Sequence, residues 1–571
     1  MNNVKELYRQ WREKAVLDAE LIEELEKIEN DENAVFDRFY TNLSFGTAGL
    51  RGVIGAGTNR MNVYTVGQAT QGLADYLNSE FKNPSVAIAY DSRIKSDVFA
   101  KCAAGVLAAN GIKVYFYPVL VPTPMLSFAV RRLHCSSGII ITASHNPSEY
   151  NGYKCYDPNG YQMTDEAADK TYAFIEKVDM FDGVKMTNFN EAVESGMVSF
   201  IGDDVFEEFY EKVLSASVFD CSGSDIKIIY SPLNGTGNIP VREILRRKGI
   251  SNVKVVKEQE MPDGKFPTCP FPNPEIKQAF EKAIEMTADY EADLLLATDP
   301  DCDRVGIAVR DNGEYRLLSG NEVGVMLADY LLSVRKANGT LPEKPIVVKS
   351  FVTTGLVNEV SRAYGAETVE LLTGFKYIGE LITQLEEKGE ENRFVIGMEE
   401  SYGYLSGIHA RDKDAVVASM LICEMACFYK AKGISLYERM KQIYDEYGMY
   451  FNKLDNFVFK GASGMEKMNK IMEDMRNNPP KKISGLDVTE TADYKLSVRE
   501  NTVTGEKTEI RLPKSNVLSY QLPGSCRVIV RPSGTEPKIK VYITACADGE
   551  EKAAALSEKI SSDMKKIMKI D

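Results

Sequence analysis

A single serine stands in a polar loop directly after a run of β-branched residues. Residues 138–141 read Gly-Ile-Ile-Ile and predict a buried strand, and the loop Thr142-Ala143-Ser144-His145-Asn146-Pro147 follows it. Because open α/β sheets bind ligands at the carboxyl ends of their strands, Ser144 is a candidate nucleophile. Ser, Asn and Pro are also ordinary turn residues, so this assignment needs support from other segments.

Three carboxylates alternate in a second loop, residues 298–304, which lies between two apolar runs. Asp299, Asp301 and Asp303 repel one another unless a cation lies between them, and their oxygens suit Mg²⁺ or Ca²⁺. A calcium-binding EF-hand loop needs Gly at its sixth position and Glu at its twelfth; this chain has arginine at both, so that class of site is excluded. The alternative is a solvated acidic turn, but the strand-like residues 305–309 favour a buried position.

A guanidinium, two hydroxyls and a flexible backbone occur together in residues 531–538. Arg is a fork-shaped donor and Gly lets backbone N–H groups approach a ligand closely, so this segment suits an anion with several oxygens, such as phosphate. A plain β-turn between the strand-like residues 528–530 and 539–543 explains the segment equally well. The candidate phosphate ligands are Arg531, Ser533, Gly534 and Thr535.

Adjacent acids, a hydroxyl and aromatic rings form a fourth loop at residues 397–404, Gly-Met-Glu-Glu-Ser-Tyr-Gly-Tyr. Carboxylates that face vicinal hydroxyls are a common polar element of sugar sites, so Glu399 and Ser401 are candidates for binding a sugar. Alone the signal is weak, because paired acids also cap the segments that follow them.

Taken in their order along the chain, the four loops resemble those of the α-D-phosphohexomutase family, which includes phosphoglucomutases and phosphomannomutases. The Ser-His-Asn-Pro loop followed by Asp-Pro-Asp-x-Asp-Arg at this separation is highly specific, and the resemblance covers nearly the whole chain. The length and the Glu-Glu-Ser-Tyr-Gly-Tyr loop look most like the bacterial phosphoglucomutase branch, which is related to phosphopentomutases. Four further segments belong to the resemblance: Phe45-Gly46-Thr47-Ala48-Gly49-Leu50-Arg51-Gly52, Tyr90-Asp91-Ser92-Arg93, Pro262-Asp263-Gly264-Lys265-Phe266-Pro267 and Arg411-Asp412-Lys413-Asp414.

The resemblance implies a phosphotransferase that interconverts hexose 1-phosphate and hexose 6-phosphate, with α-D-glucose phosphates as the expected substrates. The resting enzyme would carry a phosphoserine at Ser144, give this group to a sugar monophosphate, and take back the other phosphate of the resulting bisphosphate. The expected cofactors are Mg²⁺ and glucose 1,6-bisphosphate, the latter as intermediate and activator. The expected metal ligands are Ser144, Asp299, Asp301 and Asp303.

Proton transfer to and from the sugar needs an acid–base group, and Lys413 is the first candidate, with His145 and Lys154 as alternatives. A lysine needs a lowered pKa to act as a base, and neighbouring Arg charge is one means of lowering it. The catalytic set would also include Arg51 and Arg304, because an acidic chain must concentrate positive charge where it binds a phosphate.

Several alternatives remain open for the activity. Phosphopentomutase and phosphomannomutase activities differ only in the sugar. A metal-dependent sugar phosphatase would use the same groups but pass the phosphoryl group to water, so release of inorganic phosphate would identify it. A catalytically idle sugar-phosphate sensor is disfavoured, because a sensor needs no acid–base group such as Lys413.

The formal net charge of −15 disfavours nucleic acid and anionic membranes as partners. No apolar run approaches membrane-spanning length, and residues 5–14 predict an amphipathic helix rather than a signal peptide. The ten cysteines include no Cys-x-x-Cys pair and read as reduced thiols of a cytoplasmic protein. We therefore expect a sugar phosphate as ligand, no nucleic-acid or membrane partner, and see no sign of a protein partner.

At 571 residues the chain exceeds what one hydrophobic core supports. Strands alternate with amphipathic helices to about residue 440, which predicts three mostly parallel, mixed α/β domains, and a smaller C-terminal α+β domain completes them around a central cleft. We expect shorter strands after residue 448 and a closing helix from Gly549. The expected domains are 1–205 with the phosphoserine, 206–318 with the metal, 319–445 with the sugar site and 446–571 with the phosphate site.

Overall fold

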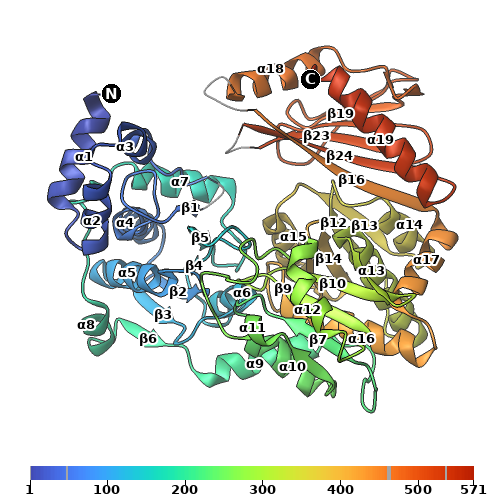
Figure 1. Ribbon diagram of the computed structural model, residues 1–571, viewed down its shortest axis with the longest axis horizontal. Helices are drawn as coiled ribbons and strands as arrows, with labels where there is room; N and C mark the ends of the chain where they lie inside the picture. The colour runs from blue at the N-terminus through green and yellow to red at the C-terminus, as the bar shows by residue number, and fades with distance from the viewer. Residues whose placement is uncertain (1, 47–48, 460–463, 534–536, 571) are drawn as a thin grey trace. The chain divides into compact units, whose positions relative to one another are not determined.

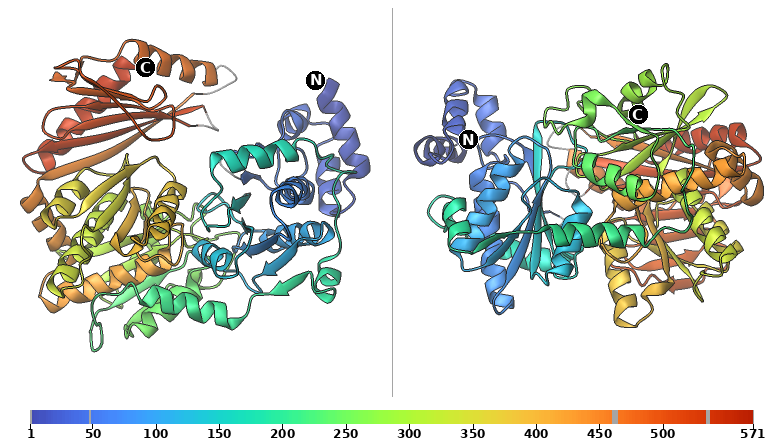
Figure 2. Two further views of the ribbon diagram at one scale, coloured as in Figure 1. Left: turned by 180° about the vertical axis from the view of Figure 1, so that it is seen from behind. Right: turned by 90° about the horizontal axis from the view of Figure 1, so that it is seen from below.

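The computed structural model describes residues 2–46, 49–459, 464–533 and 537–570. The chain forms two compact units: unit 1 comprises residues 1–320 and 375–435, and unit 2 comprises residues 321–374 and 436–571. Figures 1 and 2 show the helices and strands of both units, coloured along the chain.

Three short helices open unit 1 and pack around Trp11, whose side chain is buried among other aromatic rings. Asp18 and Asp31 are the N-caps of the second and third helices, where their carboxylates accept backbone N–H groups. The predicted helix over residues 5–14 is confirmed as part of the first. The three are α1 (Asn2–Lys14), α2 (Ala19–Lys27) and α3 (Glu32–Phe39).

A six-stranded mixed sheet follows in the order β1-β5-β4-β2-β3-β6. Its central strand β4 is buried at every position, as its apolar run predicts for a strand covered on both faces. Strand β4 runs parallel to β2 and antiparallel to β5. The serine loop therefore connects two neighbouring antiparallel strands, β4 and β5, and lies at the carboxyl end of β4. The elements are β1 (Gly49–Val53), α4 (Val63–Glu80), β2 (Ser85–Tyr90), α5 (Ser96–Ala109), β3 (Lys113–Phe116), α6 (Thr123–Arg132), β4 (Ser137–Ile141), β5 (Tyr150–Tyr156), α7 (Asp165–Ile175), α8 (Phe189–Glu194), β6 (Val198–Phe200) and α9 (Asp203–Leu214).

The second sheet of unit 1 has five strands in the order β11-β10-β9-β7-β8. The fully buried strand β9 pairs antiparallel with β10, and Thr298 lies opposite Val305. The carboxylate loop is therefore the connection of a hairpin whose two strands hold its ends together. The elements are β7 (Ile228–Ser231), α10 (Asn238–Arg247), β8 (Val253–Val255), α11 (Lys257–Glu260), η1 (Lys277–Phe280), α12 (Glu281–Met286), β9 (Leu294–Thr298), β10 (Val305–Asp311) and β11 (Glu314–Leu318).

A third part of unit 1 carries the acid-rich loop between two antiparallel strands, β14 and β15. The helix α16 follows; its N-cap Asp414 accepts hydrogen bonds from two backbone N–H groups, which fixes the segment just before it. The elements are α15 (Phe375–Glu387), η2 (Glu391–Arg393), β14 (Phe394–Glu399), β15 (Gly403–Leu405) and α16 (Ala415–Ala431).

Unit 2 contains two parallel strands, β12 and β13, and a seven-stranded antiparallel sheet in the order β16-β24-β23-β22-β19-β20-β21. The closing helix α19 begins after Gly549, as predicted, and buries Ile560 and Met564 in the core of this sheet. The elements are α13 (Gly320–Ala337), β12 (Ile346–Ser350), α14 (Leu356–Ala363), β13 (Glu367–Leu371), α17 (Leu436–Tyr447), β16 (Met449–Val458), α18 (Gly464–Asn477), β17 (Lys482–Ile483), β18 (Leu486–Asp487), β19 (Glu490–Asp493), β20 (Val498–Asn501), β21 (Lys507–Glu509), β22 (Leu518–Gln521), β23 (Arg527–Pro532), β24 (Lys538–Ala547) and α19 (Glu550–Ile567).

The predicted fold class, mixed α/β domains followed by an α+β domain, is confirmed. The prediction of shorter strands after residue 448 is wrong for β16 and β24, which each span ten residues and pair along their whole length. Polar residues such as Lys453 and Asp455 interrupt the apolar pattern of β16, which hides its length in the sequence. The four domain boundaries stay predictions.

Within the described residues all ten cysteines are free thiols, and eight of them are buried. None of the helices in these ranges combines the length and the apolar character that crossing a membrane requires.

Candidate active site

Ser144 follows β4 in a left-handed backbone conformation, with a φ of +52°. Its N–H donates to Thr142 Oγ1 (2.8 Å), and its hydroxyl donates to Asp299 Oδ2 (2.9 Å). Non-glycine residues keep this conformation where the surrounding structure imposes it, and such residues cluster at functional sites. The predicted nucleophile therefore contacts the predicted metal loop directly.

Asp299, Asp301 and Asp303 form a buried cluster in which one oxygen of each lies within 4.8 Å of the others. Among the described residues, Oδ1 of Asp301 and Oδ1 of Asp303 have no hydrogen-bond donor. Burial, followed by the charges of the other two aspartates, raises the pKa of Asp299 well above its ordinary value. Buried carboxylate oxygens that lack donors fit a hard divalent cation, so this cluster is able to hold a metal.

Neighbouring donors favour the ionised form of Asp301. Burial acts to raise its pKa, but Lys154 Nζ at 3.0 Å and the Thr123 hydroxyl at 2.9 Å contact Oδ2 and bring the pKa below its ordinary value. Strand β5 thus brings Lys154 to the metal loop as an ion-pair partner of Asp301.

Two further cations flank the serine loop. Arg304 pairs with Glu275 at 2.6 Å, and Arg51 on β1 donates to Asn146 Oδ1 at 3.3 Å. Burial, and then the charges of Arg304 and Arg51, lower the pKa of His145 well below its ordinary value. His145 Nδ1 lies 3.2 Å from the hydroxyl oxygen of Ser144, so a neutral imidazole stands beside the nucleophile.

Lys413 lies between carboxylates. Its Nζ is 3.2 Å from Asp412 Oδ1, 3.4 Å from Asp303 Oδ2 and 5.5 Å from the ring centre of Phe375. Burial opposes the charge, but Asp303, Asp412 and Glu399 together raise the pKa of Lys413 above its ordinary value. Arg304 therefore does not lower the pKa of Lys413 in this arrangement, because attraction from the three carboxylates exceeds its repulsion.

The acid-rich loop also belongs to this site. Glu399 ends β14, is buried, and acts electrostatically on both Lys413 and Arg304. The Ser401 hydroxyl contacts Glu400 Oε1 at 3.4 Å. Glu399 is therefore placed with the lysine and the metal loop, while the role of Ser401 in binding a sugar stays a prediction.

Gly403 makes room for the catalytic lysine candidate. A Cβ at this position would lie 2.2 Å from Lys413 Cδ and 2.7 Å from its Cγ. Only glycine lets the lysine side chain cross β15 toward Asp303.

The phosphate candidates belong to unit 2. Arg531 lies on β23, and the N–H of Ser533 donates to Lys538 O at 2.7 Å. Gly534 and Thr535 lie outside the described residues. The phosphate-binding assignment stays a prediction.

Sequence reasoning missed the residues that hold the catalytic candidates in place. Thr123 contacts Asp301, Glu275 contacts Arg304, and the Tyr156 hydroxyl donates to Asp412 Oδ2 at 2.6 Å. These three lie far in sequence from their partners, and no local pattern distinguishes them from other polar residues.

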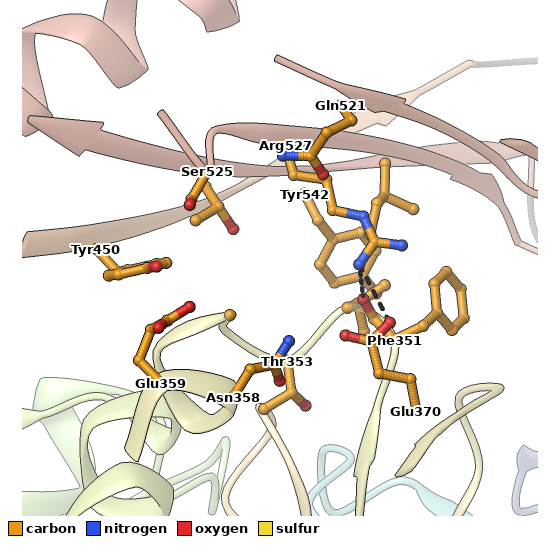
Figure 3. A pocket seen from close by; sticks show the side chains of 14 residues that line it. Phe351, Thr353, Asn358, Glu359, Glu370, Tyr450, Gln521, Ser525, Arg527 and Tyr542 are labelled. Atoms are coloured by element: carbon orange, nitrogen blue, oxygen red, sulfur yellow. Dashed lines mark hydrogen bonds and ion pairs between the residues drawn. The ribbon is translucent and has the colours of Figure 1, made fainter. Parts of the chain in front are cut away.

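A separate cavity of about 160 Å³ opens in unit 2 (Figure 3). Arg527 forms part of its wall, where Nη1 donates to Phe351 O (3.3 Å) and to Glu370 Oε2 (3.4 Å). Lys349 pairs with the same carboxylate at 2.7 Å. Because these two cations share Glu370, we assign this cavity no phosphate-binding role.

Models of one protein family match four segments of the chain. The phosphoglucomutase/phosphomannomutase α/β/α domain I matches residues 42–181, domain II residues 207–313 and domain III residues 319–447; the C-terminal domain matches residues 514–561. The serine, carboxylate, acid-rich and arginine loops fall one in each.

Individual proteins agree with the family models. A phosphoglucomutase of Staphylococcus haemolyticus is 35% identical over 90% of this chain and 92% of its own length, and one of Staphylococcus aureus is 36% identical over 92% and 93%. The solved structure of parafusin, a phosphoglucomutase from Paramecium, covers 93% of this chain and 96% of its own with 18% identity and a TM-score of 0.68. A phosphoglucomutase/phosphomannomutase family protein of Burkholderia thailandensis, also 18% identical, covers 92% and 96% with a TM-score of 0.66. At this identity the two structures establish the fold alone.

Proposed function

Because the chain belongs to the α-D-phosphohexomutase family, we propose that the protein is a phosphoglucomutase, an enzyme that interconverts α-D-glucose 1-phosphate and glucose 6-phosphate. The observation that carries the proposal is the 2.9 Å contact between Ser144 Oγ and Asp299 Oδ2 within the buried carboxylate cluster. A serine hydroxyl beside a candidate cation site is the arrangement that phosphoryl transfer through a phosphoserine requires.

In the proposed cycle Ser144 begins as a phosphoserine. The free hydroxyl of the sugar monophosphate attacks the phosphorus, and the bond from phosphorus to Ser144 Oγ breaks. The attacking hydroxyl gives its proton to the protein, and Ser144 Oγ takes up a proton. The resulting glucose 1,6-bisphosphate then reverses its orientation, so that its other phosphate faces Ser144. Ser144 Oγ gives up its proton and attacks this phosphorus, the bond from phosphorus to the sugar oxygen breaks, and the released sugar oxygen takes up a proton. The sum is an isomerisation without net loss of phosphate.

We propose Mg²⁺ as the cation, held by Asp299, Asp301, Asp303 and an oxygen on Ser144. When bound, the ion supplies charge neutralisation for the transferring phosphoryl oxygens. Arg304, fixed by Glu275, adds a permanent positive charge beside the same loop.

We assign the acid and base roles from the protonation states of Lys413 and His145. Lys413 is held protonated by its carboxylate neighbours and is placed to give a proton to a departing sugar oxygen. His145 is held neutral and is placed to take a proton from Ser144 Oγ. Lys154 remains an alternative, although its ion pair with Asp301 favours an electrostatic role.

We propose that the remaining candidate residues bind the substrate. Glu399 and Ser401 would hold sugar hydroxyls, and Arg51 would add positive charge beside the serine loop. We place the enzyme in the cytoplasm, because ten free thiols persist in a reducing compartment. The segment assigned to the distal phosphate contains Arg531, Ser533, Gly534 and Thr535.

The deciding experiment incubates the purified protein with Mg²⁺, a trace of glucose 1,6-bisphosphate, and glucose 1-phosphate, mannose 1-phosphate or ribose 1-phosphate in turn. We expect glucose 6-phosphate to form fastest and inorganic phosphate to stay at background. Faster turnover of mannose or ribose phosphate would reassign the sugar, and stoichiometric phosphate release would make the protein a phosphatase.

A second experiment tests the role of Ser144 as the nucleophile. We expect part of the purified protein to carry one phosphate on the peptide that contains Ser144, as intact mass and peptide mapping would show. Ser144→Ala should lose turnover even with added bisphosphate. A Ser144→Ala enzyme as active as the wild type would remove the nucleophile assignment.

A further inference from the structure

Arg93 holds the backbone of the serine loop by hydrogen bonds. The proposed roles of Ser144 and of the carboxylate cluster do not explain why a buried arginine binds this loop. Its Nη1 donates to Pro147 O (2.8 Å) and Tyr150 O (3.0 Å), and its Nη2 donates to Ser144 O (2.5 Å) and to Asn146 O. The four N–H bonds of the two Nη atoms thus meet four carbonyl oxygens, which span the loop from the nucleophile to the start of β5.

The guanidinium is itself fixed from two other directions. Asp91 Oδ2 lies 3.5 Å from Arg93 Nε, and both side chains are fully buried. The ring of Phe266, from the Pro-Asp-Gly-Lys-Phe-Pro segment, lies 5.1 Å from the guanidinium carbon. Asp91 Oδ1 in turn accepts from the backbone N–H of Arg93 and from the Ser96 hydroxyl, so the carboxylate has little freedom to move.

The loop needs such a clamp because Ser144 adopts an unfavourable conformation. A left-handed φ costs a non-glycine residue roughly 1–2 kcal/mol, and the loop would relax if nothing opposed that cost. Relaxation at Ser144 would rotate its side chain away from Asp299 Oδ2, which now lies 2.9 Å from Oγ. Charge-assisted hydrogen bonds to the carbonyls on both sides of the loop oppose this rotation.

Resting on the proposed phosphotransfer at Ser144, we propose that Arg93 is a positioning residue that holds the nucleophile in its reactive geometry through four backbone carbonyls. Its Nη atoms donate to backbone carbonyls and not to the Ser144 hydroxyl, so in this proposal it acts on the rate of phosphoryl transfer and not on sugar binding. Lysine cannot replace it, because an ammonium group is a single point with three donors and cannot span four carbonyls.

The test uses full-length enzyme from which the serine phosphate has been removed, and glucose 1,6-bisphosphate carrying radioactive phosphate. Two quantities are measured for the wild type and for Arg93→Lys: the phosphate loaded per protein, and the rate constant of loading by rapid quench. We expect the same loading stoichiometry and a rate constant about 10²-fold lower, because a misplacement on the order of 1 Å costs about that factor. The KM for glucose 1-phosphate should remain close to that of the wild type.

Arg439→Lys is the matched control. Arg439 on α17 forms a two-pronged pair with the fully buried Asp329 at 3.0 Å, so its replacement also removes a buried fork contact. We expect this variant to load phosphate at the wild-type rate for each folded molecule. A merely structural role for Arg93 would lower the number of sites that load and leave their rate unchanged, and that result would overturn the inference.

If Arg93→Lys does not accumulate as folded protein by circular dichroism, Asp91→Asn decides the question. This substitution keeps the shape of the side chain and removes the charge that holds Arg93 Nε. A loading rate about tenfold lower supports the clamp, and a wild-type rate per loaded site overturns it. Failure of the proposed function is distinguishable, because a wild type that neither loads phosphate nor converts any sugar phosphate lacks the activity itself.

Discussion

Tyr156 donates a hydrogen bond of 2.6 Å to Asp412 Oδ2, while the other oxygen of Asp412 contacts both the N–H and the Nζ of Lys413. Burial, and then the charge of Asp412, raises the pKa of Tyr156 well above its ordinary value, so the phenol stays a donor. A fully buried tyrosine thus sets the orientation of the carboxylate that holds the proposed acid–base lysine.

The first prediction concerns this chain of contacts. Tyr156→Phe should lower kcat about tenfold and leave KM nearly unchanged, and it should cost about 1–3 kcal/mol of stability by leaving a buried carboxylate oxygen without its donor. Steady-state kinetics and denaturant unfolding measure the two effects. Tyr117→Phe is the control, because its hydroxyl also makes one buried hydrogen bond, of 2.9 Å to Met125 O, in the same unit. Equal kcat losses in both variants would contradict a specific role for Tyr156.

Removal of divalent cations should abolish activity, and added Mg²⁺ should restore it, because two buried carboxylate oxygens of the cluster have no hydrogen-bond donor among the residues that the structure describes. Asp303→Asn should weaken the restoration, shifting the Mg²⁺ concentration for half-maximal rate upward. Activity and metal content are measured together after exhaustive chelation. Full activity in protein shown to be free of metal would rule out a catalytic cation here.

Lys413→Ala and Arg531→Ala should change different kinetic constants. Lys413→Ala should lower kcat by about 10²–10⁴-fold, the usual contribution of a general acid–base group. Arg531→Ala should mainly raise KM, because a distal phosphate clamp binds ground state and transition state about equally. A Lys413→Ala enzyme with unchanged turnover would remove this residue from the mechanism, and an Arg531→Ala enzyme with unchanged KM would remove the clamp.

Glu399→Gln should reduce glucose 1-phosphate turnover strongly while affecting the loading of Ser144 by bisphosphate less. The carboxylate is the proposed partner of vicinal hydroxyls, and its loss also removes one of the charges that raise the pKa of Lys413. Comparison of steady-state turnover with single-turnover loading separates the two effects. Unaltered kinetics on every sugar phosphate tested would leave Glu399 as a structural acid.

Glu370 in unit 2 predicts a dependence of stability on pH. Burial acts to raise its pKa, but Lys349 and Arg527 outweigh burial and lower the pKa to about 2. The folded pKa lies below the unfolded value of about 4.3, so the stabilisation is complete above that value and is lost as pH falls toward about 2. The Tm difference between wild type and Glu370→Gln should therefore be largest near neutral pH and should shrink toward about pH 3.

The control for this prediction is Glu359→Gln, which removes a surface pair with the exposed Arg362. It should change the Tm little at any pH. A Tm difference for Glu370→Gln that stays constant across the acidic range would show that the charge of Glu370 contributes nothing to folding.

The sequence predicted where the functional loops lie along the chain, but not which distant residues contact them. Residues 138–141 and 294–298 are apolar runs, and such runs place Ser144 and Asp299 at strand ends. That the two loops share one site was implied only by the family resemblance, because β4 and β9 belong to different sheets. The left-handed φ of Ser144 could not be predicted, because backbone conformation there depends on a distant guanidinium. The pKa of Lys413 could not be predicted either, since Asp303 lies more than a hundred residues away in the chain.

Gly403 limits the genetic variation that this chain tolerates. Every amino acid that a glycine codon reaches by one nucleotide change carries a Cβ, and a Cβ at residue 403 would lie 2.2 Å from the Lys413 side chain. An alanine at this position, distant from Ser144 in sequence, should displace the Lys413 side chain. Variants at this codon should therefore appear in a population as loss-of-function alleles.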